Sequence, residues 1–163
     1  MSVTVNSIIS GVGSTSSTRI AGSGSASAVT GTTNETTLAT FNLAGSSLGA
    51  NGLLRVYCLW SMTNNANTKT PRIKIGASQI ATTSGFASNA SAETNSNTWA
   101  QNSQAVQKTN VSMVTPFGVS TAALTGTTVD LTTDQTVTIT GQLGVSTDTL
   151  TLEAWYAEVI YAV

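Results

Sequence analysis

The stretch 53–62, Leu-Leu-Arg-Val-Tyr-Cys-Leu-Trp-Ser-Met, decides the fold class of this chain. Its side chains alternate between two faces, as they do along a β-strand, and every residue of one face is apolar: Leu54, Val56, Cys58, Trp60 and Met62. Arg55, Tyr57 and Leu59 share the other face, so we expect both faces to be covered. Cys58, the single cysteine, is predicted to be a small buried hydrophobic residue.

The rest of the sequence also favours β structure. Thr, Val and Ile are abundant, whereas the helix formers Glu, Lys, Gln and Arg are scarce. Short β-rich runs are separated by turn clusters such as Asn51-Gly52, which is the spacing of a sandwich or barrel. Besides 53–62, the predicted strands are 36–43, 72–75, 79–83, 98–102, 111–115, 127–131, 135–143 and 149–161. About eight to ten strands predict an all-β, antiparallel, two-sheet β-sandwich.

Composition divides the chain into two parts. Residues 1–31 contain Gly/Ser-rich stretches that cannot bury enough surface to offset their ordering entropy, so we expect a flexible N-terminal arm. Four apolar residues near its start are candidate partner-binding residues for attachment: Val3, Val5, Ile8 and Ile9. Residues 32–163 are predicted to be one β-sandwich domain.

The titratable residues argue against an enzyme. The 163 residues include no histidine and are only 8% charged, so the usual groups for proton transfer or metal binding are scarce. Asp130, Asp134 and Asp148 do not have the spacing of a calcium loop, and we expect turn and cap roles for them rather than a calcium site. We therefore predict no catalytic residue, no cofactor and no metal. Lys69, Lys74 and Lys108 lie in polar stretches and are expected to be exposed.

Charge and hydropathy exclude other partners. A net charge of −1 provides no basic patch for nucleic acid, and no apolar stretch is long enough for a signal core or a membrane span. The first cation, Arg19, comes too late for a basic leader. We expect a protein that is made in the cytoplasm and binds neither nucleic acid nor membrane.

Two single residues stand out. Glu158 alternates in register with Leu150 and Leu152, so we expect a cation, Arg55 or Arg72, opposite this carboxylate. Trp99 lies in a polar stretch that we expect to be a loop, where burial explains an aromatic residue less easily. It is a candidate for ligand contact, although closing one end of the sandwich or forming an oligomer seam would also explain it.

Several segments resemble a module that recurs in virion proteins of tailed bacteriophages. They are 32–39, 48–56, 60–70 (Trp-Ser-Met-Thr-Asn-Asn-Ala-Asn-Thr-Lys-Thr), 133–143 and the final strand 150–159. The resemblance covers most of residues 32–162. It implies a jelly-roll-like, trimeric protein displayed on a capsid or tail surface, and it supplies no catalytic residues.

The resemblance and the brevity of the chain together favour a homotrimeric capsid decoration (cement) protein, located on the virion and produced in the host cytoplasm. Its partners would be two further copies of itself and the major capsid protein or another virion protein. The alternative is a short tail fibre or receptor-binding tip that recognises a host surface glycan or protein. A glycan-cleaving enzyme would need a pair of carboxylates that the sequence does not reveal.

Overall fold

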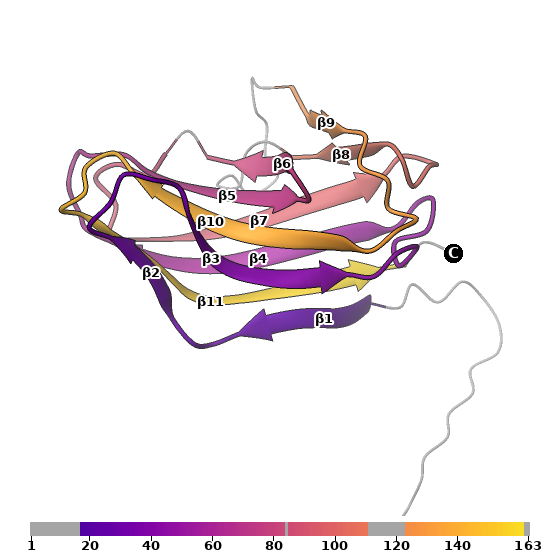
Figure 1. The fold of residues 1–163 in the computed structure, drawn as a ribbon, viewed down its shortest axis with the longest axis horizontal. Helices are drawn as coiled ribbons and strands as arrows, with labels where there is room; N and C mark the ends of the chain where they lie inside the picture. Colours follow the sequence, from indigo (N-terminus) through magenta and orange to yellow (C-terminus); the bar gives the residue numbers. More distant parts are fainter. Residues whose placement is uncertain (1–16, 84, 111–122, 162–163) are drawn as a thin grey trace, which may run out of the picture.

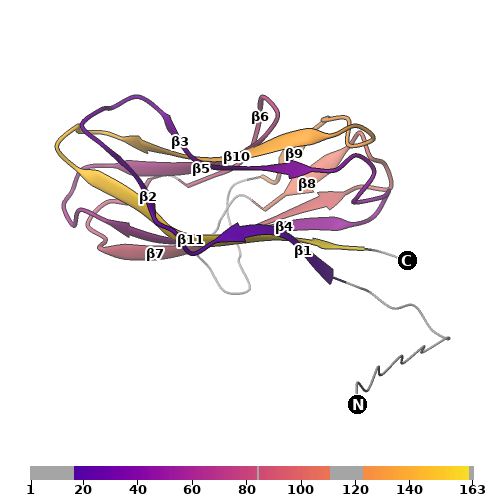
Figure 2. The same ribbon diagram turned by 60° about the horizontal axis from the view of Figure 1, so that its bottom comes forward.

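The computed structural model describes residues 17–83, 85–110 and 123–161, which form two antiparallel β-sheets packed face to face (Figures 1 and 2). The strands are β1 (Ser17–Ser23), β2 (Ser27–Thr30), β3 (Thr36–Leu43), β4 (Leu53–Met62), β5 (Lys69–Ile75), β6 (Ser78–Thr82), β7 (Ser91–Ala100), β8 (Gln107–Thr109), β9 (Thr125–Thr127), β10 (Gln135–Leu143) and β11 (Thr149–Ile160). The predicted all-β, antiparallel sandwich is confirmed.

The strand order is that of a jelly roll with added edge strands. Sheet A has the order β1-β11-β4-β7-β8-β9, with β2 also pairing with β11, and sheet B has the order β3-β10-β5-β6. Without β1, β8 and β9, the two sheets read β2-β11-β4-β7 and β3-β10-β5-β6. The chain therefore folds back on itself, so that strands near its start pair with strands near its end: β2 with β11, and β3 with β10. This is the arrangement of a jelly roll.

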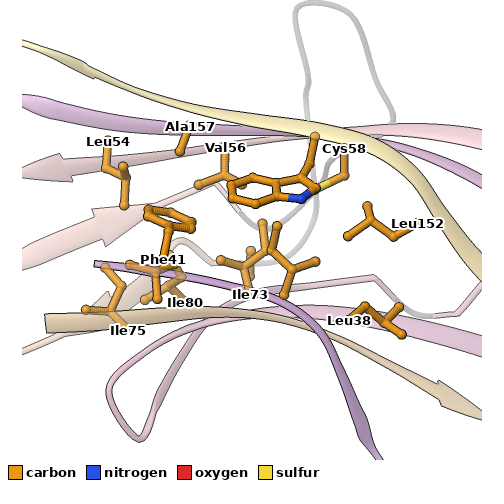
Figure 3. Close-up of a cluster of buried hydrophobic side chains, with 14 of the residues drawn as sticks. Leu38, Phe41, Leu54, Val56, Cys58, Ile73, Ile75, Ile80, Leu152 and Ala157 are labelled. Atoms are coloured by element: carbon orange, nitrogen blue, oxygen red, sulfur yellow. The ribbon is translucent and has the colours of Figure 1, made fainter. Parts of the chain in front are cut away.

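The core lies between the two sheets, where apolar side chains from both sheets interdigitate (Figure 3). Leu54, Val56 and Cys58 project from β4 toward Ile73 and Ile75 of β5, and all five are at most 1% exposed. Because burial disfavours the thiolate, the pKa of Cys58 is raised to about 12. Cys58 is thus the buried hydrophobic residue that its place in the sequence predicted.

Most predicted strands are present, three of them with the predicted ends. Runs 36–43, 53–62 and 135–143 match β3, β4 and β10, and 149–161 exceeds β11 by one residue. Runs 72–75 and 79–83 correspond to the later part of β5 and to β6. The predicted strand at 127–131 is wrong, since β9 ends at Thr127, and 111–115 lies outside the described residues.

Strand β7 is far longer than the predicted run 98–102. Its inward positions hold hydroxyl side chains instead of aliphatic ones, so the sequence lacks the apolar alternation of a strand. Two of these hydroxyls have internal partners: the indole Nε1 of Trp60 donates to Thr94 Oγ1 at 3.0 Å, and Thr98 and Thr109 share a hydrogen bond of 2.8 Å. The third, Ser96 Oγ, is buried without a hydrogen-bond partner among the described residues. Trp99 accordingly lies on a strand, as the predicted run 98–102 indicated, and the expected polar loop around it is wrong.

The sandwich begins earlier than residue 32. Residues 17–30 contain β1 and β2, which pair antiparallel with β11, so the predicted arm of residues 1–31 is too long. An edge strand is held by backbone hydrogen bonds and needs few apolar side chains, which explains why a Ser/Gly-rich sequence can form one. Val3, Val5, Ile8 and Ile9 lie outside the described residues.

A β-bulge in β11 changes which residues face the core. The register of β11 against β4 shifts between Leu152 and Ala154, so the alternation reverses there. Trp155 continues the inner face begun by Leu150 and Leu152, whereas Glu158 faces outward. The predicted common face of Glu158 and these leucines is therefore wrong, but the predicted partner Arg55 is correct.

The three lysines differ in burial. Lys108 is exposed and Lys74 is half-buried, but Lys69 is completely buried, which contradicts the prediction for this residue. Its ammonium group lies against Asn65, Asn67 and Asp148. Polar partners supplied by a loop and by a distant turn make this burial tolerable, and neither the loop's path nor the turn's position can be read from the local sequence.

Candidate binding face on sheet A

The outer face of sheet A is built by three central strands in tight register. Residues opposite one another in β11, β4 and β7 form rows across the sheet. These rows are Ile160-Leu53-Trp99, Glu158-Arg55-Asn97 and Tyr156-Tyr57-Asn95. Since outward positions recur at every second residue, the three rows lie side by side on one face.

The middle row is a network of polar groups. Arg55 Nη1 lies 2.7 Å from Glu158 Oε1, and Arg55 Nε donates to Asn97 Oδ1 at 3.0 Å. Arg19 of β1 stands opposite Glu158, which extends the row to the edge of the sheet. The hydrogen-bonded network itself joins one cation, one carboxylate and one amide: Arg55, Glu158 and Asn97.

An aromatic stack lies next to this network. The rings of Tyr57 and Tyr156 are stacked, with centroids 5.3 Å apart and planes inclined by 19°, and the Arg19 guanidinium carbon lies 5.9 Å from the Tyr156 ring centroid. Burial raises the pKa of Tyr57, and a hydrogen bond with Glu93 raises it further. Tyr57 therefore remains a neutral phenol at physiological pH.

The same face exposes large apolar side chains that the sandwich core does not use. Trp99 is 48% exposed and Leu59 is 37% exposed. Leu53 is only 3% exposed, although it points away from the core cluster between the two sheets. A two-layer sandwich needs apolar residues on its inner faces only, so this outer surface is available for association.

The outer face of sheet B has a different character. Its rows are polar, as in Thr40-Thr138-Lys74-Gln79. Glu35 lies 2.6 Å from Lys74 Nζ and 3.7 Å from Arg72 Nη1. Burial alone would raise the pKa of Glu35, but its hydrogen bonds with Lys74 and Thr140 lower it overall. The two outer faces of the molecule are therefore chemically distinct.

The predicted site residues have separate locations. Trp99 lies on the outer face of sheet A, and the four arm residues lie outside the described residues. Asp130 accepts hydrogen bonds from Thr132, Asp134 accepts one from the backbone of Gly45, and Asp148 accepts one from Asn65. Among the described residues, no three His, Cys, Asp or Glu side chains gather in a way that could hold a metal.

Sequence reasoning missed the tyrosine stack. Tyr57 was recognised as outward-facing, but the bulge in β11 concealed the matching orientation of Tyr156.

In the part of the chain that the structure describes, no helix has the length and apolar character needed to cross a membrane. Comparisons of the chain with protein-family models, with curated proteins and with solved structures found no match.

Proposed function

We propose that this chain is a structural protein of a tailed-bacteriophage virion, a homotrimeric capsid decoration protein whose subunits meet through the outer face of sheet A. The proposal rests on the sequence resemblance and above all on one structural observation. The outer face of sheet A carries exposed Trp99 and Leu59 and the Tyr57–Tyr156 stack, whereas the outer face of sheet B is polar. Aromatic residues flanked by polar groups are typical of protein interfaces.

Two further features support this role. The jelly-roll strand order occurs in viral capsid and lectin domains, although a fold alone does not define a function. Edges of both sheets, at β9 and at β3 and β6, have no strand partner among the described residues. Subunit contacts in an oligomer would cover such edges, which otherwise promote uncontrolled strand pairing. The role requires no chemistry on a substrate.

The oligomeric state and the contact face are tested with two matched variants. Leu59→Glu places a charge on the outer face of sheet A, and Thr138→Glu places one on the outer face of sheet B. We expect the wild type and Thr138→Glu to sediment as trimers at micromolar concentration and Leu59→Glu to sediment as a folded monomer. A monomeric wild type, or a Leu59→Glu trimer, would contradict the proposal.

The location on the virion is tested separately. Antibodies raised against the recombinant protein should label the capsid of phage particles produced from the encoding genome, as seen by immunogold electron microscopy. Label confined to the tail would favour the second candidate, a receptor-binding tip.

A specific observation supports this second candidate. Trp99 presents a half-exposed indole, and the adjacent row holds Arg55, Asn97 and Glu158. An aromatic ring beside fixed donors and acceptors is what a sugar ring requires. Titration of host cell-wall glycans against the wild type, Trp99→Ala and the control Thr138→Ala tests it. Binding lost only in Trp99→Ala would support glycan recognition.

A further inference from the structure

A cluster of three polar side chains, two of them buried and the third half-buried, lies where loops meet at one end of the sandwich. Lys69 begins β5, Asn65 belongs to the loop between β4 and β5, and Asp148 immediately precedes β11. The side chains of Lys69 and Asp148 are 1% and 3% exposed. Lys69 is also held by two backbone hydrogen bonds with Phe86 and lies opposite Leu143 in β10, both of them buried apolar residues.

The Asn65 amide is contacted at both of its polar atoms. Lys69 Nζ lies 2.5 Å from Asn65 Oδ1, and the backbone N–H of Asn67 donates to the same oxygen at 3.0 Å. Asn65 Nδ2 donates to Asp148 Oδ1 at 2.7 Å. The ammonium of Lys69 is thus held by a hydrogen bond to the oxygen of the amide whose carbon it would attack, and such positioning lowers the entropic cost of a reaction between bound groups.

Asp148 connects the two nitrogen atoms. Its Oδ1 accepts the hydrogen bond from Asn65 Nδ2, and its Oδ2, which is buried and has no hydrogen-bond partner, lies 3.5 Å from Lys69 Nζ. One carboxylate oxygen therefore faces an amine and the other faces an amide nitrogen. This is the position of a group that carries a proton from a nucleophile to a leaving group.

We propose that Lys69 and Asn65 join in an intramolecular isopeptide bond, with Asp148 carrying the proton and the Asn67 N–H stabilising the oxyanion. This modification is independent of the proposed virion role.

The atoms balance without an added reactant. The ammonium of Lys69 first transfers one proton to Asp148 Oδ2, which produces a neutral amine from the resting ion pair. The amine attacks Asn65 Cγ, and the negative charge that develops on Oδ1 is stabilised by the Asn67 N–H. The C–N bond to Nδ2 then breaks as Asp148 delivers its proton to that nitrogen, and ammonia departs.

A final proton transfer, from the new isopeptide nitrogen to Asp148, leaves only neutral groups in the buried site. The new bond is first an N-protonated amide, and its extra proton passes to the Asp148 carboxylate. The five hydrogens on the ammonium of Lys69 and the amide of Asn65 thus end as one on the isopeptide nitrogen, three on ammonia and one on Asp148. A buried ion pair is replaced by a neutral amide and a neutral carboxyl, which removes its desolvation cost.

Intact mass spectrometry of the denatured wild-type chain tests the proposal. We expect a mass below that of the sequence by about 17 Da, the mass of one ammonia. Trypsin should not cleave after an acylated Lys69, so residues 56–72 should appear as one peptide that carries the whole deficit. A chain of full sequence mass, with normal cleavage at Lys69, would overturn the proposal.

Three variants locate the bond and assign the roles. Lys69→Arg removes the nucleophile, and Asp148→Asn keeps the shape of the side chain but cannot accept the proton, so both should retain the full mass expected for their sequences. Lys74→Arg, a change on the same strand but on its solvent side, should still show the deficit.

Two other outcomes would also overturn the assignment. A deficit that persists in Lys69→Arg would place the loss elsewhere, for example at the Asn51-Gly52 step. A deficit of about 18 Da, with the Asp148 peptide joined to Lys69, would mean that water was lost and that the carboxylate was the acceptor. Because the wild-type measurement requires no substitution, a variant that fails to fold does not affect the test.

Discussion

Arg55 and Glu158 face each other from adjacent strands on the outer face of sheet A, with 2.7 Å between Nη1 and Oε1 and side chains that are 33% and 19% exposed. The pair occupies the row between the Tyr57–Tyr156 stack and the row that contains Trp99. In the proposed trimer, this pair would be buried in the subunit interface.

A double-mutant cycle measures the coupling free energy between Arg55 and Glu158. In the monomeric Leu59→Glu background, where the groups are partly solvated, Arg55→Met and Glu158→Gln should show a coupling of about 0.2–1 kcal/mol in the free energy of unfolding, and salt should reduce it. Urea unfolding at low and high ionic strength gives both values. A coupling of zero at low salt would mean that the ion pair contributes nothing to folding.

The pH dependence of the free energy of unfolding should show how much the ionised Glu35 carboxylate stabilises the fold. Its pKa is lower in the folded protein than its ordinary value of 4.5, so its ionised form stabilises the fold. That contribution is complete above the unfolded pKa and is lost as the pH falls through the folded pKa. The stability difference between wild type and Glu35→Gln should therefore shrink below roughly pH 4.5, and its size at neutral pH should stay near or below about 1 kcal/mol.

Lys74→Met serves as the control for this titration. It removes the nearest cation, so the loss of stability on acidification should be smaller than in the wild type. If the wild type and Glu35→Gln lose stability in parallel between pH 6 and about pH 3, Glu35 makes no net contribution.

Gly141 of β10 lies at a close contact between the two sheets. A Cβ at this position would lie 3.1 Å from side-chain atoms of Leu150, Leu38 and Val29. Gly141→Ala should therefore destabilise the fold by about 1–3 kcal/mol through overpacking. Gly24→Ala is the matched control, since a Cβ there meets no atom within 4 Å and should change stability by less than about 0.5 kcal/mol. Equal midpoints for the two variants in urea would show that the core can adjust.

The local alternation of apolar and polar residues predicted the fold class and the central strands because this alternation is strong there, as in 53–62. The prediction failed where a residue's orientation or burial depends on residues that are distant in the sequence. The bulge in β11 inverted the expected orientation of Glu158, and the burial of Lys69 depends on Asp148, which is far away along the chain. The binding face was only partly foreseen, through Trp99, since its rows arise from the register of three strands.

The polar inner side of β7 offers a test of how this strand is held. Thr94 Oγ1 accepts the hydrogen bond of the buried Trp60 indole at 3.0 Å. Thr94→Val keeps the shape but removes the acceptor, so it should cost about 1–3 kcal/mol. Thr94→Ser retains the hydroxyl and should restore most of that stability. Urea unfolding followed by tryptophan fluorescence compares the three, and a Thr94→Val variant as stable as the wild type would show that the hydroxyl is dispensable.

The proposed attachment by the N-terminal residues leads to a test on particles. The described chain begins with β1 at the edge of sheet A, and the four apolar residues Val3, Val5, Ile8 and Ile9 precede it. Four such side chains, buried at about 1.5–3 kcal/mol each, would contribute roughly 6–12 kcal/mol before the entropy of ordering the chain is subtracted. A single chain would then bind weakly, and three in a trimer would bind tightly through effective concentration.

Deletion of residues 2–10 should leave a soluble trimer with unchanged thermal stability that no longer joins the phage particle. A matched control replaces the four apolar residues by serine in the full-length chain, which keeps the length and removes only the apolar contacts. Occupancy is measured by quantitative mass spectrometry of purified particles. If both variants still decorate particles at the wild-type level, attachment depends on the sandwich itself, and the loops nearest Thr32 become the surface to mutate next.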